Sequence, residues 1–371
     1  MNVRPAVPSF PEIEVPDGPV RDPAEWRGPD LTHSTEWQYH FDGRDLAELD
    51  AALREVNRQD LGVIQMRGKR DFPLPRLGET LAQFRGEILD GRGFVLLRGL
   101  PVDDYSRLDV AKIYWGIGLH LGYPVVQNGK GHMLGHVVDL GSVPNMPASE
   151  PGMKREFIHT EIRGYNSRNR FFFHVDNADI VGLLCLHPAM QGGESLIVSS
   201  VAIHNEIQRR RPDLLRVLYQ PFWVSRMSEV PAGARPYVAM PVFHHYQGRL
   251  IASYWRAWVE ACKIFPELPP VTDEQRAAFD LIDELANDPQ FHLSMDLEKG
   301  DIQFINNHVT LHTRTAYEDF PEPERKRHLL RLWLVSPEGR PLPDWFYEYY
   351  GAGRRGGIYV AGVTEVASLE P

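Results

Sequence analysis

The length, composition and charge of the chain indicate an ordinary globular protein. It has 371 residues, of which 43% are hydrophobic and 24% charged, which is enough for a large buried core. The formal net charge is −10 and the basic residues form no long tract, which argues against a nucleic-acid partner, because phosphate binding needs concentrated positive charge. No stretch approaches the roughly 20 apolar residues of a membrane span. Residues 1–20 lack the apolar segment of a secretory signal, so we expect a cytoplasmic protein.

The first part of the chain predicts an arm followed by helices. Residues 1–40 are rich in Pro and Asp and have no periodicity, so we expect an extended N-terminal arm. Apolar residues at helical spacing follow, with a short buried strand after a Gly-rich break. The predicted helices cover 45–56, 77–89 and 106–121, and the predicted strand covers 94–97.

From residue 135 onward the pattern changes to short strands. Apolar or alternating segments are separated by turns rich in Gly, Pro, Asn and Asp, a pattern typical of a sandwich or barrel. The segments are 135–140, 170–176, 180–186, 194–198, 221–226, 236–245, 250–255, 291–296, 301–306 and 328–335, with helices at 201–219 (broken at Pro212) and 273–286. We therefore predict a mainly β fold with flanking helices (α+β). The expected architecture is one double-stranded β-helix (jelly-roll) domain over 41–371, with its core at 93–335.

A long polar segment precedes one of these strands. Residues 142–169 are rich in turn residues, and loops of that length in compact domains are usually lids or binding elements. Gly152 and Gly164 are candidate hinges, so we predict a lid.

A His-x-Asp pattern carries the first chemical signal. His174 and Asp176 are two residues apart in a predicted strand, so their side chains point to the same side. One imidazole and one carboxylate are two ligands of a 2-His-1-carboxylate triad, a geometry that leaves positions open for oxygen chemistry at Fe(II). Two histidines, His308 and His312, follow the break at 306–307 and compete for the third position, and a polar loop at 313–319 comes next.

The order of these features resembles the taurine dioxygenase / clavaminate synthase-like family of Fe(II)- and 2-oxoglutarate-dependent oxygenases, over residues 93–335. In that family a His-x-Asp (or Glu) is followed by a distal His, a loop and an arginine. The resemblance places the distal ligand at His312, which stands immediately before an x-Arg-Thr sequence, rather than at His308. It places the arginine at Arg327, fifteen residues beyond His312.

The resemblance implies the cofactors and the reaction. Fe(II) would be bound by His174, Asp176 and His312, and Arg327 would hold the far carboxylate of 2-oxoglutarate, since a guanidinium grips a carboxylate with two parallel hydrogen bonds. Ser195, in a Gly-Gly-Glu-Ser turn, would help hold that carboxylate, although the family more often has Thr there. Decarboxylation of 2-oxoglutarate to succinate, with O2, would be coupled to hydroxylation, desaturation or cyclisation of a small organic substrate.

A second arginine lies on the same face of the last predicted strand. Arg327, Leu329 and Arg331 alternate with a period of two, so Arg331 also points inward and needs an anion. Either an acidic group of the substrate or an internal salt bridge would supply it.

Two other functions stay open. One is a cupin-type dioxygenase that uses no keto acid, against which Arg327 argues. The other is a non-catalytic jelly-roll binding protein with a vestigial metal site. The substrate, a homo-oligomeric state and the role of the aromatic run 345–350 are not decided by the residues; the run could line a pocket, pack on the arm or form a subunit contact.

Overall fold

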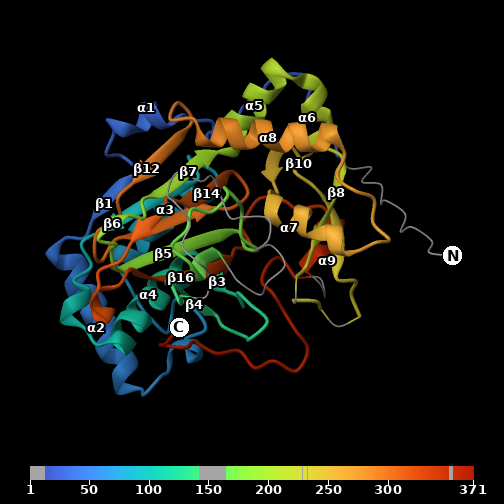
Figure 1. Cartoon of the computed structure of the whole chain (residues 1–371). Coiled ribbons are helices and arrows are strands. Elements are labelled where there is room, and N and C mark those ends of the chain that lie inside the picture. The colour runs from blue at the N-terminus through green and yellow to red at the C-terminus, as the bar shows by residue number, and fades with distance from the viewer. Residues whose placement is uncertain (1–12, 142–163, 228, 232, 351–353) are drawn as a thin grey trace.

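The computed structural model describes residues 13–141, 164–227, 229–231, 233–350 and 354–371. Its centre is two β-sheets with helices on the outside (Figure 1). The larger sheet has the order β1-β2-β13-β5-β16-β3, with β4 also pairing with β16, and the smaller has the order β12-β7-β14. The strands are β1 (Gln38–His40), β2 (Phe94–Arg98), β3 (Tyr123–Pro124), β4 (Leu134–Val137), β5 (Ile180–His187), β7 (Ser195–Ser199), β12 (His292–Met295), β13 (Ile302–Asn306), β14 (Thr310–Arg314) and β16 (His328–Val335).

The alternation of side chains along the strands explains how the sheets pack. In β2, Val95 and Leu97 belong to an apolar cluster shared with the helices, whereas Phe94 and Leu96 belong to a cluster between the sheets. The second cluster includes Ile197 of β7, so the smaller sheet covers the inner face of the larger one. Successive residues of a strand point to opposite faces, and both faces of this sheet are therefore buried.

The N-terminal helices cover the outer face of the larger sheet. They are α2 (Gly43–Arg58), α3 (Leu77–Leu89) and α4 (Arg107–Leu121), close to the predicted ranges. The side chain of Asp42 caps α2 by accepting from the backbone N–H of Arg44 and Asp45, and Ser106 caps α4 in the same way. Asp and Ser at these positions therefore set where the helices begin.

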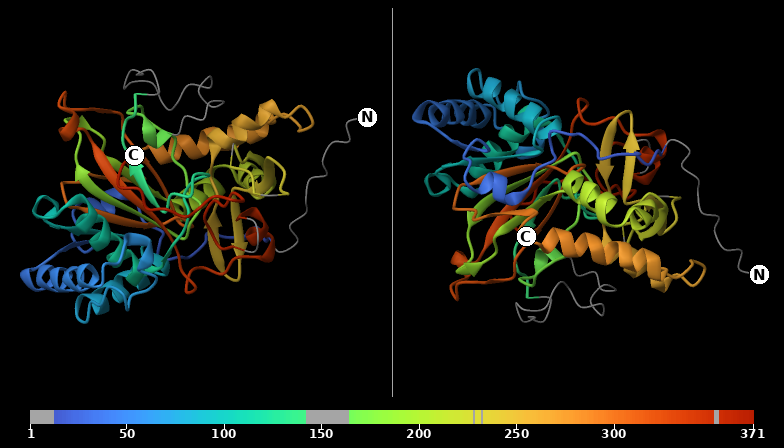
Figure 2. Two further views of the ribbon diagram at one scale, coloured as in Figure 1. Left: turned by 90° about the horizontal axis from the view of Figure 1, so that it is seen from below. Right: turned by 90° about the horizontal axis from the view of Figure 1, so that it is seen from above.

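A long insert separates β7 from β12, which are neighbours in the smaller sheet. It lies on the side of the molecule away from α2–α4 (Figure 2). Its elements are α5 (Ser200–Arg210), α6 (Pro212–Leu218), β8 (Pro221–Ser225), β9 (Tyr237–Pro241), β10 (Phe243–Tyr246), β11 (Arg249–Ala252), α7 (Arg256–Ala261) and α8 (Asp273–Asn287). The C-terminal helix α9 (Asp344–Tyr350) packs onto this insert through Phe346, Tyr349 and Tyr350. Phe346, Tyr349 and Tyr350 of the aromatic run are thus part of the core, and Trp345 and Tyr347 are partly buried against it.

The described part of the N-terminal arm is folded against the domain. It contains α1 (Gly28–Thr32) and β1, which pairs in parallel with β2. The carboxylate of Asp22 accepts two hydrogen bonds from Arg340, at 2.7 and 2.9 Å, and both side chains are buried. The arm therefore contributes a strand and a buried ion pair, which the absence of periodicity did not indicate.

The Asp22–Arg340 pair gives a testable stability effect. Replacing Asp22 by Ala leaves a buried guanidinium without its carboxylate, so we expect a loss of about 3–5 kcal/mol in the free energy of unfolding. Burial raises the pKa of Asp22, but the hydrogen bond and charge of Arg340 outweigh it and the pKa lies below its ordinary value. The stabilisation is therefore present near pH 7 and is lost as the pH falls below roughly 4. Urea unfolding at pH 7 and pH 3 measures this, with the exposed Asp17→Ala as control; equal losses in both variants would contradict the prediction.

Two strand predictions around the site are corrected. Residues 170–176 form no strand, and a single β-bridge joins His174 to His312. Other groups, rather than the ladder of a partner strand, bind the backbone on either side of His174. Tyr254 O accepts from the N–H of Val175, and the side chain of Thr313 donates to Phe171 O. In contrast, 310–314, expected to lie beyond the strand and partly in a loop, form β14, because they pair with β7. Residues 317–318 form a further short strand, β15 (Tyr317–Glu318), paired with β6 (Gln191–Gly192).

Most of the predicted lid, residues 142–163, lies outside the described residues. Within the described ranges, the structure contains no helix with the length and apolarity needed to cross a bilayer.

Candidate metal centre

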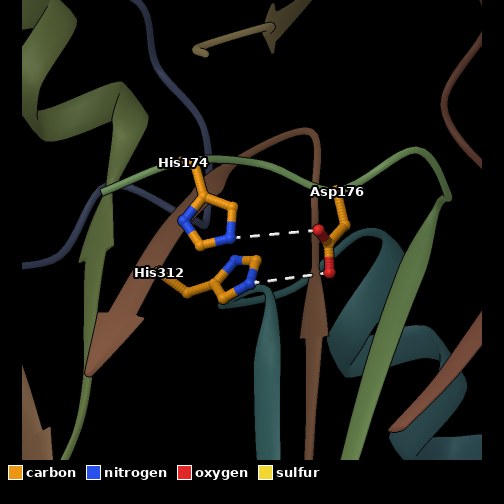
Figure 3. Close-up of side chains that lie close together, drawn as sticks. All are labelled: His174, Asp176 and His312. Carbon is orange, nitrogen blue, oxygen red and sulfur yellow. Dashed lines mark ion pairs between the residues drawn. The ribbon is translucent and has the colours of Figure 1, made fainter. Parts of the chain in front are cut away.

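His174, Asp176 and His312 meet at one point in the protein (Figure 3). Each offers one potential ligand atom, and the three atoms lie within 4.8 Å of one another. His174 Nε2 is 3.9 Å from Asp176 Oδ1, and His312 Nε2 is 3.8 Å from Asp176 Oδ2. Two imidazoles and one carboxylate at this separation match the donor set of a facial triad.

The backbone around His174 fixes the direction of its ring. Its N–H donates to His312 O at 3.1 Å and its carbonyl accepts from the His312 N–H at 3.0 Å, so the two histidines are adjacent across one bridge. His174 Nδ1 lies 2.9 Å from Phe172 O. Because a carbonyl oxygen only accepts, Nδ1 carries the proton and the lone pair of Nε2 faces Asp176.

Asn307 holds the backbone that carries Asp176. Its side-chain oxygen accepts from the Asp176 N–H at 3.1 Å, and its amide nitrogen donates to the carbonyls of Asp176 and Ala178 at 3.2 and 3.1 Å. Asn307, which the sequence indicates only as part of a break after a strand, therefore binds the backbone next to the triad in place of a neighbouring strand.

His308 lies in a different environment from His312. Its Nε2 is 2.7 Å from Asp179 Oδ1, and Asp179 also accepts from Arg355 at 2.6 Å and from the N–H of Ser336 at 2.8 Å. The structure thus brings His312, and not His308, to the other two candidate ligands, as the sequence predicts.

Burial and charge set the protonation of the triad. Burial would raise the pKa of Asp176, but the charge of Arg331, together with the two histidines and Trp333, holds it below its ordinary value. Burial lowers the pKa of His312 to about 3 and also lowers that of His174. Near neutral pH the site therefore offers two neutral imidazoles and one carboxylate, the forms that bind a metal ion.

Arg327 lines the same cavity as the triad and forms no ion pair with a carboxylate of the described residues. It is 4% exposed, its Nη2 donates to Gly193 O at 3.3 Å, and its guanidinium lies 4.9 Å from the ring centre of Tyr317. Among the described residues, Nη1 is buried without a hydrogen-bond partner. Within the described part of the chain, the carboxylate of Asp319 accepts from the backbone N–H of Arg327, at 2.8 Å, and not from its guanidinium. Burial lowers the pKa of Arg327, a sign that its charge is poorly compensated.

The Gly-Gly turn makes room for this arginine. Gly193 has φ of +81°, and a Cβ there would lie 2.9 Å from Arg327 Nε. Ser195, two residues on, lines the cavity, but its hydroxyl donates to Gln303 at 3.0 Å. The structure thus places Ser195 in the same cavity as Arg327, with the proton of its hydroxyl already donated to Gln303.

Arg331 points inward, as the alternation predicts, and has partners within the protein. Its Nη1 lies 3.3 Å from Asp176 Oδ2 and its Nε donates to Gln127 at 2.8 Å. The guanidinium is 4.7 and 4.8 Å from the ring centres of Tyr165 and Trp333. The sequence offers two anions for Arg331, an acidic group of the substrate or a carboxylate of the protein. In the structure a protein carboxylate is present, that of Asp176, which is also a candidate metal ligand.

Aromatic side chains form a large part of the remaining lining of the cavity. Trp255 and Trp258 of the insert are stacked at 5.9 Å with an angle of 6° between their planes, and Tyr349 of α9 stacks on Trp255 at 5.3 Å. Phe171 contacts His174 edge to face. The charged Arg256 in this wall is paired with three carboxylates, those of Glu260, Asp280 and Asp283.

Arg314 ties the cavity to the end of the predicted lid. From β14 it donates to the carbonyls of Gly164, Ser167 and Asn169. A Cβ on Gly164 would lie 2.5 Å from the ring of Phe171. Gly164 is therefore needed for close packing and is tied to the strand of His312, which does not favour a hinge at this position.

The sequence interpretation missed four residues that contact the candidate site. Trp333 continues the alternation of Arg327, Leu329 and Arg331, so the same period of two would have placed it in the cavity. Asn307, Gln127 and Arg314 act through contacts between segments distant in the chain, for which one sequence gives no signal.

Comparison with known proteins identifies the class. Residues 57–333 match the family described as taurine catabolism dioxygenase TauD, TfdA family. The chain belongs to this family. It is a 2-oxoglutarate-dependent dioxygenase, an oxidoreductase, as its motifs predict.

Individual relatives extend this over most of the chain. The chain is 31% identical to FR-33289 synthase of Streptomyces rubellomurinus over 89% of its length and 94% of the relative. It is 30% identical to taurine hydroxylase-like protein SAT17 of Stachybotrys chartarum, over 86% of this chain and 81% of the relative. A structure of asparagine oxygenase with Fe(II), 2S,3S-3-hydroxyasparagine and succinate superposes with a TM-score of 0.58, 20% identity and coverage of 81% and 93% of the two chains. A structure of the non-heme iron oxygenase OrfP with Fe and alpha-ketoglutaric acid superposes with a TM-score of 0.52 and 13% identity. The match covers 81% of this chain and 94% of the OrfP chain. These structures share the fold.

Proposed function

We propose that His174, Asp176 and His312 bind Fe(II), and that Arg327 binds the far carboxylate of 2-oxoglutarate in the same cavity. The observation that carries the proposal is the buried Nη1 of Arg327, which has no partner among the described residues and belongs to a side chain that lines the same cavity as the triad. Bound iron would supply the activation of O2, with decarboxylation of 2-oxoglutarate to succinate. Anaerobic titration with Fe(II) and 2-oxoglutarate tests it, because triad variants should lose the metal and Arg327 variants the keto acid.

The protein's own residues position the reactants and exclude water. The imidazole of His174 is oriented by Phe172 O, and that of His312 by the bridge between the two backbones. Arg327 offers a charged donor where bulk water does not compete, and such a bond is stronger than in water. The Ser195 hydroxyl of the same cavity is the proposed second contact to the carboxylate, to which it would donate in place of Gln303. The aromatic wall of Trp255 and Trp258 keeps the substrate side of the cavity apolar.

The proposed substrate is a small organic molecule, which the enzyme hydroxylates or, alternatively, desaturates or cyclises. Asparagine oxygenase and uridine-5'-phosphate dioxygenase, both similar to parts of this chain, are named for small polar substrates. We propose that an acidic group of the substrate binds Arg331, which lines the cavity and is 7% exposed. Because Arg331 also contacts Asp176, a substrate bound to Arg331 would lie next to the metal site.

The role of Arg331 is tested with Arg331→Leu, once a screen for succinate release has found a substrate. Loss of a charge-assisted hydrogen bond corresponds to roughly 10- to 100-fold in KM. The rise should occur for the acid and not for its primary amide, while 2-oxoglutarate affinity is unchanged. Equal KM values for the acid in wild type and variant would refute substrate recognition. A variant that loses iron instead would show that only the Asp176 contact matters.

The finer architecture follows from the same observations. We propose that the facing sheets form a double-stranded β-helix of the clavaminate synthase-like type. The packing of the smaller sheet onto the inner face of the larger one supports this, as does the likeness to the two solved oxygenases. We also propose a single oxygenase domain over 41–371 with the arm wrapped on it, and a cytoplasmic location, in keeping with the family to which the chain belongs.

A further inference from the structure

The hydrogen bonds to the Asp176 carboxylate are unevenly distributed. The two that described residues donate both end on Oδ2, from Trp333 Nε1 at 2.8 Å and from Arg331 Nη1 at 3.3 Å. Both donors come from the inward face of β16. Distance to the imidazoles does not distinguish the two oxygens, since they lie 3.9 and 3.8 Å from the nearest Nε2 atoms. The hydrogen-bond donors do distinguish the two oxygens, because Trp333 and Arg331 both donate to Oδ2.

Two donors on one oxygen limit how the carboxylate can bind a metal ion. A carboxylate oxygen has two lone pairs, and Oδ2 already accepts from two N–H groups. A carboxylate that used both oxygens would occupy two coordination positions, whereas one oxygen leaves a further position for the keto acid or O2. Hydrogen bonding of Oδ2 to its two donors would therefore keep one coordination position of the metal ion free for the keto acid or O2.

We propose that Trp333 is a positioning residue of the metal centre: its indole N–H, with Arg331, holds Asp176 Oδ2, so that Asp176 binds the metal through Oδ1 alone. The inference rests on the proposed function. Neither the motifs nor the relatives assign a role to Trp333.

The environment of Trp333 suits this role. It is 3% exposed and packs in the apolar cluster between the sheets, so its ring has little freedom. Its N–H is neutral and does not titrate, and it is the shorter of the two contacts. The charge of Arg331 lowers the pKa of Asp176, whereas the hydrogen bond from Trp333 orients the Oδ2 atom. The backbone of Asp176 is fixed independently by Asn307.

Trp333→Phe tests the role, because it keeps an aromatic ring and removes the donor. We expect Fe(II) affinity to fall by about 10- to 100-fold, the usual effect of losing an outer-shell partner. We also expect the visible band of the Fe(II)–2-oxoglutarate complex to shift in energy. The matched control is Trp115→Phe, 2% exposed, which removes an indole donor to Met66 O at 3.0 Å in the helical layer. It should be destabilised similarly, with unchanged affinity and band.

A measurement on the wild-type chain decides the matter if Trp333→Phe does not fold. With Zn(II) as a diamagnetic probe, the assigned indole N–H resonance of Trp333 should stay downfield and protected from exchange before and after metal binding. Loss of that hydrogen bond on adding Zn(II) would overturn the inference, as would a Trp333→Phe variant with wild-type affinity and band. Failure of the wild-type chain to bind any metal would instead refute the proposed function.

Discussion

His312→Ala should abolish Fe(II) binding and, with it, the weak visible band that develops when 2-oxoglutarate is added under anaerobic conditions. His312 contributes one of three ligand atoms within 4.8 Å, so its removal should cost more than the 10- to 100-fold of an outer-shell change. His174→Ala and Asp176→Ala should behave in the same way. Calorimetric titration with Fe(II) and the absorption spectrum measure the effect.

His308→Ala is the matched control for this experiment. His308 is also a buried histidine, four residues earlier, but it is bonded to Asp179 rather than directed at the triad. Its removal leaves Asp179 with Arg355 and the Ser336 N–H, so we expect a stability loss of about 1–3 kcal/mol with normal iron binding. Iron binding that survives in His312→Ala, or disappears in a folded His308→Ala protein, would move the third ligand elsewhere.

Arg327→Ala should leave iron binding nearly intact and weaken 2-oxoglutarate. The loss expected for a buried charge-assisted pair is about 1.5–3 kcal/mol, which is roughly a 10- to 100-fold rise in Kd. Arg327→Lys should restore part of it, because an ammonium group carries the charge but cannot form two parallel hydrogen bonds. Titration of 2-oxoglutarate into the iron-loaded protein, followed by the visible band, gives both values.

The control for Arg327 is an arginine on the same sheet outside the cavity. Arg98 of β2 pairs with Asp301 at 3.0 Å, so Arg98→Ala removes a charge from the sheet without touching the proposed keto-acid site. Its 2-oxoglutarate affinity should equal that of the wild type. An unchanged Kd in Arg327→Ala would refute the assignment, and an equal loss in Arg98→Ala would show that net charge rather than the site matters.

The sequence was most informative where one local rule acts. The Leu77–Leu89 helix has its predicted bounds, and the Arg327–Arg331 alternation gave the correct inward direction. Residues 170–176 escaped prediction, because apolar alternation cannot show that Asn307, 131 residues away, takes the place of a partner strand. The partner of Arg331 was undecided for a similar reason, since both anions considered were chemically suitable and only the folded chain shows Asp176 beside it.

The insert between β7 and β12 divides the cavity into two parts with different origins in the chain. The sheets and the residues around the His174–His312 bridge supply the candidate metal ligands and Arg327, whereas the insert supplies Trp255 and Trp258 to the same cavity. The two parts are joined by a shared apolar cluster and by hydrogen bonds, among them one of 2.6 Å from Trp255 Nε1 to Val175 O. The candidate metal ligands and the tryptophan pair thus come from separate parts of the chain, so substitutions in the insert can reshape the apolar lining of the cavity without replacing a candidate ligand.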